Sequence, residues 1–282
     1  MTAASELRDE LIARGLLVAS GVPGLYGYGA AFEDLRLAVE ALVTRAAAPE
    51  RPEQLRFPPL LPREQLEATG YTQNFPHLAG AVAVLEAERW SASELALVPA
   101  ACYPVYPAIA ARGPLPASGV TVDAGGAWVF RHEPSDDPAR MQAFHQRELV
   151  RIGAPAEVRE WRERWRERGL ELLRSLGLNP VAQLANDQFF GRGGRILAAN
   201  QRSEELKYEL ALEIVGPEPT ALASFNYHRD HFGVLYGLVL ADGATAHTAC
   251  LGFGEERIAL ALLHTHGLEP ERWPQAIRAV LW

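Results

Sequence analysis

The 282-residue sequence predicts an α+β fold in which an antiparallel sheet is flanked by helices. Helical patterns come first along the chain, and several neighbouring strand-like segments follow with few helices between them. This order favours an antiparallel sheet over a doubly wound parallel sheet, in which strands and helices alternate. Two common nucleotide-binding loops, GxGxxG after a strand and GxxxxGK[ST], do not occur in the sequence.

Amphipathic patterns predict helices in the first third of the chain. Apolar residues recur at helical spacing in residues 5–18 and 31–47, and residues 77–88 are also predicted to be a helix. A proline-rich segment lies between the second and third helices. Within it, residues 55–57 are predicted to be a short strand that Pro58 ends.

Strand-like segments dominate the rest of the chain, because β-branched and aromatic residues are frequent there. The predicted strands are residues 120–122, 128–130, 144–152, 208–215, 222–225 and 235–240. Two further helices are predicted, at 155–176 and 254–266. The many arginines and glutamates of the first are interpreted as a solvated face. His228 and His231 are expected in a polar turn between strands, without a catalytic role.

Composition and charge are those of an ordinary globular protein. Hydrophobic residues make up 48% and charged residues 22%, and the net charge is −8. This net negative charge differs from the strongly positive charge that is typical of nucleic-acid-binding proteins. No apolar run is long enough to cross a bilayer, and the first residues lack the basic and apolar regions of a signal peptide. We therefore expect a cytoplasmic protein without a membrane partner, and residues 1–282 to form a single domain.

One predicted strand pair carries a charged and aromatic cluster. Arg131 and Glu133 are two residues apart, so on a strand they point to the same face. A polar turn containing prolines follows, and Arg140 and Phe144 then enter the next strand-like run. Two arginines can clamp phosphates and an aromatic ring can stack on a base. On spacing alone, a charged surface hairpin is the simpler interpretation.

A second cluster opens the last predicted helix. The segment GFGEERIALA at 252–261 places a glycine turn before a helix with Arg257 in its first turn. The positive end of the helix dipole disfavours an arginine there, and this cost makes sense if Arg257 meets a polyanion such as ATP. The alternative is an ordinary surface arginine in a glycine-capped loop.

Together these segments resemble the motifs of class II aminoacyl-tRNA synthetases. The second motif of that class is FRxE, a variable loop and (R/H)xxxF, which matches residues 130–133 and 140–144. The third motif, GxGxxRxxxA, matches residues 252–261. The helix at 31–47 and the strand near Pro58 resemble the first motif, which builds the dimer interface in that class. The resemblance therefore implies a homodimer with a class II catalytic core.

The two cysteines of the chain make this resemblance more specific, because they match one group of enzymes within the class. Methanogen-type seryl-tRNA synthetases bind zinc through two cysteines and one glutamate, and so do their truncated relatives, the amino acid:[carrier protein] ligases. The matching positions here are Cys102, Glu148 and Cys250. The resemblance implies one Zn²⁺ per chain, with an open fourth position for the substrate's amino group. On spacing alone, two small buried hydrophobic residues are the simpler interpretation.

The chain is more similar to the carrier protein ligases than to the synthetases. Fewer than about 30 residues precede the first-motif helix, which leaves little room for a tRNA-binding domain of typical size. The resemblance implies a ligase that converts ATP to AMP and pyrophosphate. It would activate glycine or alanine as an aminoacyl-adenylate and pass it to the phosphopantetheine thiol of an acidic carrier protein. Mg²⁺ is expected with ATP.

Two alternatives stay open. An enzyme on the same core could aminoacylate tRNA or another acceptor, although the short N-terminal segment and the charge of −8 count against tRNA. A relative without catalytic activity could bind only an amino acid or a nucleotide. Retention of the motif residues and of the three expected zinc ligands counts against that second alternative.

The resemblance assigns a role to each motif residue. Arg131 is expected to contact the α-phosphate and the substrate carboxylate. Glu133 is expected either to hold the adenine amino group or to order the motif loop. Arg140 and Arg257 are expected to contact the terminal phosphates, and Phe144 to stack under adenine. Arg131 and Arg257 are thus the expected catalytic residues.

Two further groups of residues are expected to contribute. Ser224 and Asn226 are predicted to line the ATP site. Residues 186–207 are expected to be an inserted element that docks the carrier, because they contain a glycine-hinged, aromatic and basic segment suited to an acidic partner. A mobile surface loop is the alternative. The expected docking residues are Arg192, Arg195 and Arg202.

Overall fold

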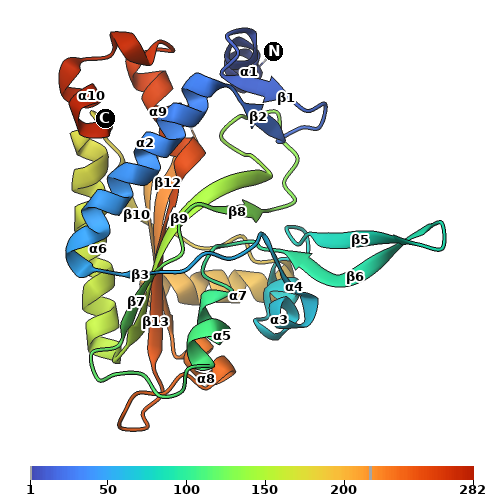
Figure 1. The fold of residues 1–282 in the computed structure, drawn as a ribbon, viewed down its shortest axis with the longest axis vertical. Coiled ribbons are helices and arrows are strands. Elements are labelled where there is room, and N and C mark those ends of the chain that lie inside the picture. The colour runs from blue at the N-terminus through green and yellow to red at the C-terminus, as the bar shows by residue number, and fades with distance from the viewer. Residues whose placement is uncertain (1, 216–217) are drawn as a thin grey trace.

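The computed structural model describes residues 2–215 and 218–282, except for the side chains of residues 192 and 193. Its centre is one large sheet (Figure 1). The strands of this sheet are β3 (Glu53–Gln54), β7 (Val120–Asp123), β8 (Ala127–Phe130), β9 (Ala143–Gly153), β10 (Val181–Leu184), β11 (Lys207–Leu212), β12 (Thr220–Arg229) and β13 (His247–Gly254).

This sheet is almost entirely antiparallel. Its order is β10-β11-β12-β13-β9-β7-β3, and β8 also pairs with β9. The only parallel pair among these described strands is β3 with β7. The sheet confirms the α+β class predicted from the order of helical and strand-like segments.

Long helices cover one face of the sheet, and shorter elements cover the other. Helices α6 (Pro155–Ser175) and α9 (Glu255–His266) lie on the first face, and α2 (Ala30–Ala47) packs on α9. The opposite face is covered by α5 (Val105–Ala110) and α8 (His231–Tyr236). Each face carries its own hydrophobic cluster, because neighbouring residues of one strand point to opposite faces. Leu149 therefore belongs to the first cluster and Val150 to the second.

Smaller elements complete the chain. They are α1 (Ala3–Ala13), β1 (Leu17–Ala19), β2 (Tyr26–Tyr28), η1 (Ala48–Glu50), β4 (Leu60–Pro62), α3 (Arg63–Ala68), α4 (Tyr71–Asn74), β5 (Ala81–Glu86), β6 (Arg89–Leu97), α7 (Gly191–Ser203), η2 (Pro270–Arg272) and α10 (Gln275–Leu281). Among the described residues, none of the helices is both long and apolar enough to cross a membrane.

The helix predicted at 77–88 is wrong. These residues enter the ribbon of β5 and β6, which projects from the body of the molecule (Figure 1). Alanine, leucine and glutamate favour helix locally, but pairing with β6 overrides that preference. Gly80 is packed against the Phe130 ring, where a β-carbon would lie 2.6 Å from a ring atom. The ribbon turns at Ala87 and Glu88, both of which have positive φ.

The predicted strands at 55–57 and 235–240 are also wrong. Pairing with β7 stops at Gln54. Beyond it, the Leu55 amide and the Arg56 side chain both donate to the Asp123 carbonyl, without continuing the strand. Leu235 and Tyr236 end helix α8, because a short apolar run fits a buried helical turn as well as a strand. Val239 and Leu240 form only isolated bridges, with Thr245 and Leu115. The histidine prediction is wrong in part, since His228 lies within β12 while His231 begins α8.

The other predicted elements hold with shifted ends. The helix expected at 5–18 ends at Ala13, and the glycines at 252–254 remain inside β13. Gly252 suits this position because an added β-carbon would lie 2.6 Å from the Gln146 side-chain amide. The helices at 31–47, 155–176 and 254–266 are confirmed within one or two residues.

Candidate active site

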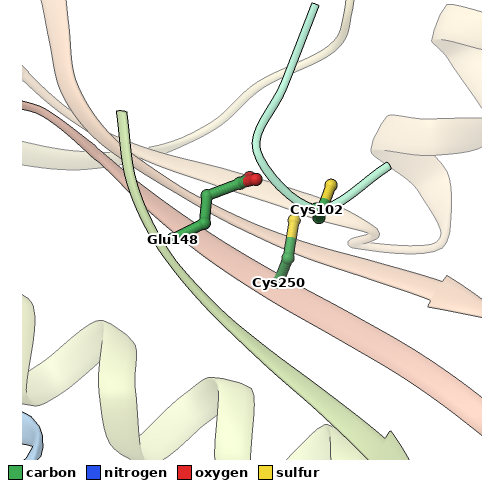
Figure 2. Close-up of side chains that lie close together, drawn as sticks. All are labelled: Cys102, Glu148 and Cys250. Atoms are coloured by element: carbon green, nitrogen blue, oxygen red, sulfur yellow. The ribbon is translucent and has the colours of Figure 1, made fainter. Parts of the chain in front are cut away.

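Three buried ligand-type side chains meet on the face of the sheet that α5 covers. Cys102 lies between β6 and α5, Glu148 on β9 and Cys250 on β13. The β9–β13 register pairs Glu148 with Gly252, two residues from Cys250, so both side chains point to the same face. The ligand atoms of all three lie within 4.8 Å of one another, and Figure 2 shows them converging from two strands and a loop.

The chemistry of this cluster fits a zinc ion. Its donor set is two thiols and one carboxylate, which are ordinary zinc ligands. Oε2 of Glu148 is buried without a hydrogen-bond partner in the described part of the chain. Burial raises the pKa of Glu148, and the hydrogen bond with Cys102 together with burial raises the pKa of Cys250. A cation would offset the cost of burying these groups as anions.

Polar neighbours surround the Cys250 sulfur. Asn226 Nδ2 and His228 Nε2 each lie 3.6 Å from Sγ. His228 Nδ1 lies 3.0 Å from Thr248 Oγ1, and burial lowers the pKa of His228 to about 3, so its ring is neutral. Sequence reasoning gave His228 no role in the site. Its alternation with Asn226 along β12 was the signal that places both on the face of the cysteines.

Arg131 directly follows β8 and continues its backbone pairing with the segment before β9, near the Cys102–Glu148–Cys250 cluster. Its amide donates to the Gln142 carbonyl at 2.8 Å, and its Nε donates to the Pro99 carbonyl at 3.2 Å. The guanidinium carbon lies 5.7 Å from the centre of the Phe144 ring. Arg131 and Phe144 therefore lie together, as the motif predicts, beside the segment that carries Cys102.

Arg257 is held from two sides. Nε donates to the Ala139 carbonyl at 2.9 Å and Nη1 to the Ala221 carbonyl at 3.1 Å. Burial and the positive charge of Arg131 lower the pKa of Arg257. Within the described residues, neither Arg131 nor Arg257 pairs with a carboxylate. Two guanidinium groups that are not engaged in ion pairs are suited to binding an anion.

Glu133 and Arg140 face each other across the loop between β8 and β9. Arg140 Nη1 lies 3.1 Å from Glu133 Oε1, and its Nε lies 3.6 Å from Asp137. The structure brings Glu133 and Arg140 together as an exposed ion pair. An ATP contact by either residue would have to replace that pair.

Ser224 and Asn226 lie on β12, opposite Gly252 and Cys250 respectively. One strand further, Glu209 and Lys207 lie opposite Ser224 and Asn226. Sequence reasoning missed Lys207 and Glu209. Their spacing of two around the start of the predicted strand at 208–215 was the available signal, because it places both on one face of a strand.

The expected docking element is helix α7 with the segment before it. The Phe189 ring stacks on Phe75 with centroids 5.0 Å apart, and the Phe190 amide donates to the Asn74 carbonyl. Arg195 and Arg202 are exposed, whereas the side chain of Arg192 lies outside the described residues. Ile196 is 66% exposed and Leu197 is 41% exposed, so the helix presents an apolar face as well as positive charge.

A buried ionic network lies behind the site, between α2 and the start of α9. Arg36 donates to Glu33 and to the buried Glu255, and Glu256 accepts from the His145 amide and from Tyr28. Burial, followed by the charge of Glu256, raises the pKa of Glu255 to about 8. Glu255 is therefore protonated in the folded protein near neutral pH.

Replacing Glu255 with glutamine is expected to flatten the dependence of stability on pH. The folded state keeps a proton that the unfolded state releases above about pH 4.5, so stability is highest below that pH and falls as pH rises toward 8. The free energy of unfolding of Glu255→Gln relative to the parent should rise by about 3.5 kcal/mol between pH 5 and 8. Urea titrations test this, with the exposed Glu271→Gln as control. Equal pH profiles for parent and Glu255→Gln would contradict it.

The geometry can be compared with known proteins. The structure superposes on the M. kandleri SerRS, solved in complex with A. aeolicus tRNASec, with a TM-score of 0.84 and 21% identity. That match covers 98% of this chain and 60% of the synthetase chain. Giardia lamblia prolyl-tRNA synthetase matches with a TM-score of 0.73 and 13% identity, over 94% of this chain and 54% of the other. The fold is therefore that of class II aminoacyl-tRNA synthetases.

Sequence relatives narrow the class to a family. The chain is 43% identical to amino acid–[acyl-carrier-protein] ligase 2 of Bradyrhizobium diazoefficiens, over 96% of this chain and 86% of that protein. It is 42% identical to ligase 1 of the same organism, over 99% of this chain and 91% of that protein. The chain belongs to this family of amino acid–[acyl-carrier-protein] ligases, so it is a ligase. A type-2 serine–tRNA ligase of Methanopyrus kandleri is 30% identical over 53% of this chain and 30% of that protein. No family model matches the chain.

Proposed function

We propose that this protein activates glycine or alanine with ATP and transfers it to the phosphopantetheine thiol of a carrier protein. One observation carries the proposal: the Cys102–Glu148–Cys250 cluster shares a sheet face with Asn226, and Arg131 bonds to the Pro99 carbonyl, three residues before Cys102. An amine-binding centre would thus lie next to a phosphate-binding arginine. The relatives that are 42–43% identical are amino acid–[acyl-carrier-protein] ligases, which supports a carrier protein as the acceptor.

Adenylate formation would use the two arginines. A carboxylate oxygen of the amino acid attacks the α-phosphorus of ATP, and the bond from that phosphorus to the bridging oxygen breaks as pyrophosphate leaves. Arg131 and Arg257 would stabilise the negative charge that develops on the phosphoryl oxygens. Phe144 would stack on adenine beside Arg131, and Mg²⁺ would accompany the phosphates of ATP. The two backbone carbonyls that hold Arg257 support this role, because they fix its direction.

Cys102, Glu148 and Cys250 would hold the zinc ion. When bound, zinc supplies a Lewis-acid position for the neutral α-amine of the substrate. Asn226 and His228 crowd the Cys250 sulfur, and Tyr106 lies 3.5 Å from His228 Nδ1. This crowding favours an amino acid with a small side chain.

Transfer would follow on the same face. The carrier thiol sulfur attacks the carbonyl carbon of the adenylate, the carbon–oxygen bond to the phosphate breaks, AMP leaves and the thiol proton passes to solvent. We propose that residues 1–282 act as one catalytic domain, with 186–207 as its inserted docking element. Helix α7 supports this because it joins two paired strands of the sheet, β10 and β11.

We also propose that the enzyme is a homodimer. Helix α2 resembles the helix of the first motif, and a groove of about 720 Å³ lies between α2 and α10 on the outer surface. Leu37 and Trp282 line this groove, and both are exposed apolar side chains. Their burial against a second copy would remove apolar surface from water.

Carrier loading tests the function. The protein is incubated with ATP, Mg²⁺, radiolabelled glycine or alanine, and a carrier protein that has or lacks phosphopantetheine. The proposal predicts label on the phosphopantetheine-bearing carrier alone, released by hydroxylamine as expected for a thioester. Charging of tRNA without charging of the carrier would overturn it.

Removing positive charge from α7 is expected to weaken carrier binding. Arg195→Ala combined with Arg202→Ala should raise the KM for the carrier about 3- to 10-fold, because each rim charge contributes a fraction of a kcal/mol. Pyrophosphate exchange should be unchanged. Arg164→Ala combined with Arg174→Ala on α6 removes the same charge elsewhere and serves as control. If exchange and transfer fall equally, α7 is not the docking element.

A further inference from the structure

The ammonium group of Lys207 lies at the edge of the candidate site. Lys207 pairs with Asn226 across β11 and β12, and Asn226 lies 3.6 Å from the Cys250 sulfur. The Lys207 side chain is only 12% exposed. Nζ lies 2.5 Å from Asp187 and 3.1 Å from Glu209, so two carboxylates hold the lysine in place.

Asp187 joins this lysine to helix α7. Gln201 Nε2 donates to Asp187 Oδ2 at 2.8 Å, and the Asp187 amide donates to Gln201 Oε1 at 2.8 Å. Burial opposes ionisation of Asp187, but Lys207, Gln201 and Arg131 together lower its pKa. One ionised carboxylate therefore contacts the helix with one oxygen and Lys207 with the other.

Lys207 lies on the sheet face of the candidate site. It pairs with Asn226 across β11 and β12, and Asn226 pairs with Cys250 across β12 and β13, so their side chains point to the same face. A held ammonium at this place would stabilise negative charge on the thiol sulfur and on the carbonyl oxygen during transfer. The negative charge that develops during adenylate formation would instead be stabilised by Arg131 and Arg257.

We propose that Asp187 is a positioning residue that couples α7 to Lys207, so that the thioester-forming step depends on the link Gln201–Asp187–Lys207. This inference rests on the proposed function, in which the carrier docks on α7. Docking would then fix the ammonium group where the thiol attacks. The link joins residues 187, 201 and 207 through side chains, and it lies outside the synthetase motifs.

Single-turnover transfer tests the coupling. Enzyme carrying the preformed adenylate is mixed with increasing concentrations of phosphopantetheine-bearing carrier, and pyrophosphate exchange is measured on the same sample. Gln201→Ala should lower the maximal transfer rate about 10-fold, because hydrogen bonds to a charged group are lost. The half-saturating carrier concentration and the exchange rate should stay within about 2-fold. Gln275→Ala, an exposed glutamine on α10 away from the docking element, is the matched control and should match the parent.

A double-mutant cycle separates coupling from general damage. Asp187→Asn should slow maximal transfer by a similar factor, and combining it with Gln201→Ala should add little, because both break one link. Additive losses, a parent-like maximal rate in Gln201→Ala, or an equal fall of exchange and transfer would overturn the coupling. Absence of exchange in the parent protein with every amino acid would instead show that the proposed function itself is wrong.

Discussion

Replacing Cys102 or Cys250 with alanine is expected to remove bound zinc and to lower amino acid activation by more than about 100-fold. Each thiol is buried within 4.8 Å of the other two ligand-type groups, so no neighbouring side chain of the cluster can take its place without moving. Loss of the metal would remove the binding position for the substrate amine. Elemental analysis and pyrophosphate exchange on the same preparations measure both effects.

Glu148→Gln tests the third ligand with little change in shape. It should lose zinc and activation together, whereas Glu67→Gln on the surface of α3 should keep both. Thermal unfolding of each variant shows whether the fold survives. Full activity of either cysteine variant without bound metal would contradict the zinc assignment.

Replacing Arg257 with alanine is expected to lower pyrophosphate exchange by about 100- to 1000-fold, the range for losing one preorganised charge-stabilising group. The guanidinium is oriented by two carbonyls and has no described carboxylate partner, so its charge is available to the phosphates. Amino acid binding, measured by calorimetry without ATP, should change little because the amine site is separate.

The control for Arg257 lies on the same C-terminal part of the chain. Arg272 is 78% exposed, and Arg272→Ala should leave exchange unchanged. Arg257→Lys keeps the charge but loses the two-sided attachment, and it should recover only part of the rate. Near-normal exchange in Arg257→Ala would exclude a catalytic role for this arginine.

Local patterns predicted the long elements of the fold but not the short ones. Helix α6 and helix α9 have apolar residues at helical spacing over many turns, so packing agrees with local preference. Residues 81–86 contain good helix formers and still pair as a strand, because the partner strand decides their structure. Residues 231–236 form a helix that is too short for its period to be recognised.

The candidate site was predictable where a motif defines it. Arg131, Phe144 and Arg257 belong to motifs, and the structure places them around one region. Cys102, Glu148 and Cys250 were identified by resemblance, since their spacing alone carries no metal signature. The contacts of Lys207 with Asp187, and of Arg36 with Glu255, depend on tertiary packing between separate segments. Such pairs have no local pattern from which they could be predicted.

Above all, we propose that this chain adenylates a small amino acid at a zinc-containing site. Amino acid-dependent ATP–pyrophosphate exchange across all the standard amino acids, with zinc assayed on the same sample, tests it most directly. The account predicts exchange with glycine or alanine alone, and about one zinc per chain. Zinc binding without exchange for any amino acid would contradict it and would leave a binding protein on a synthetase scaffold.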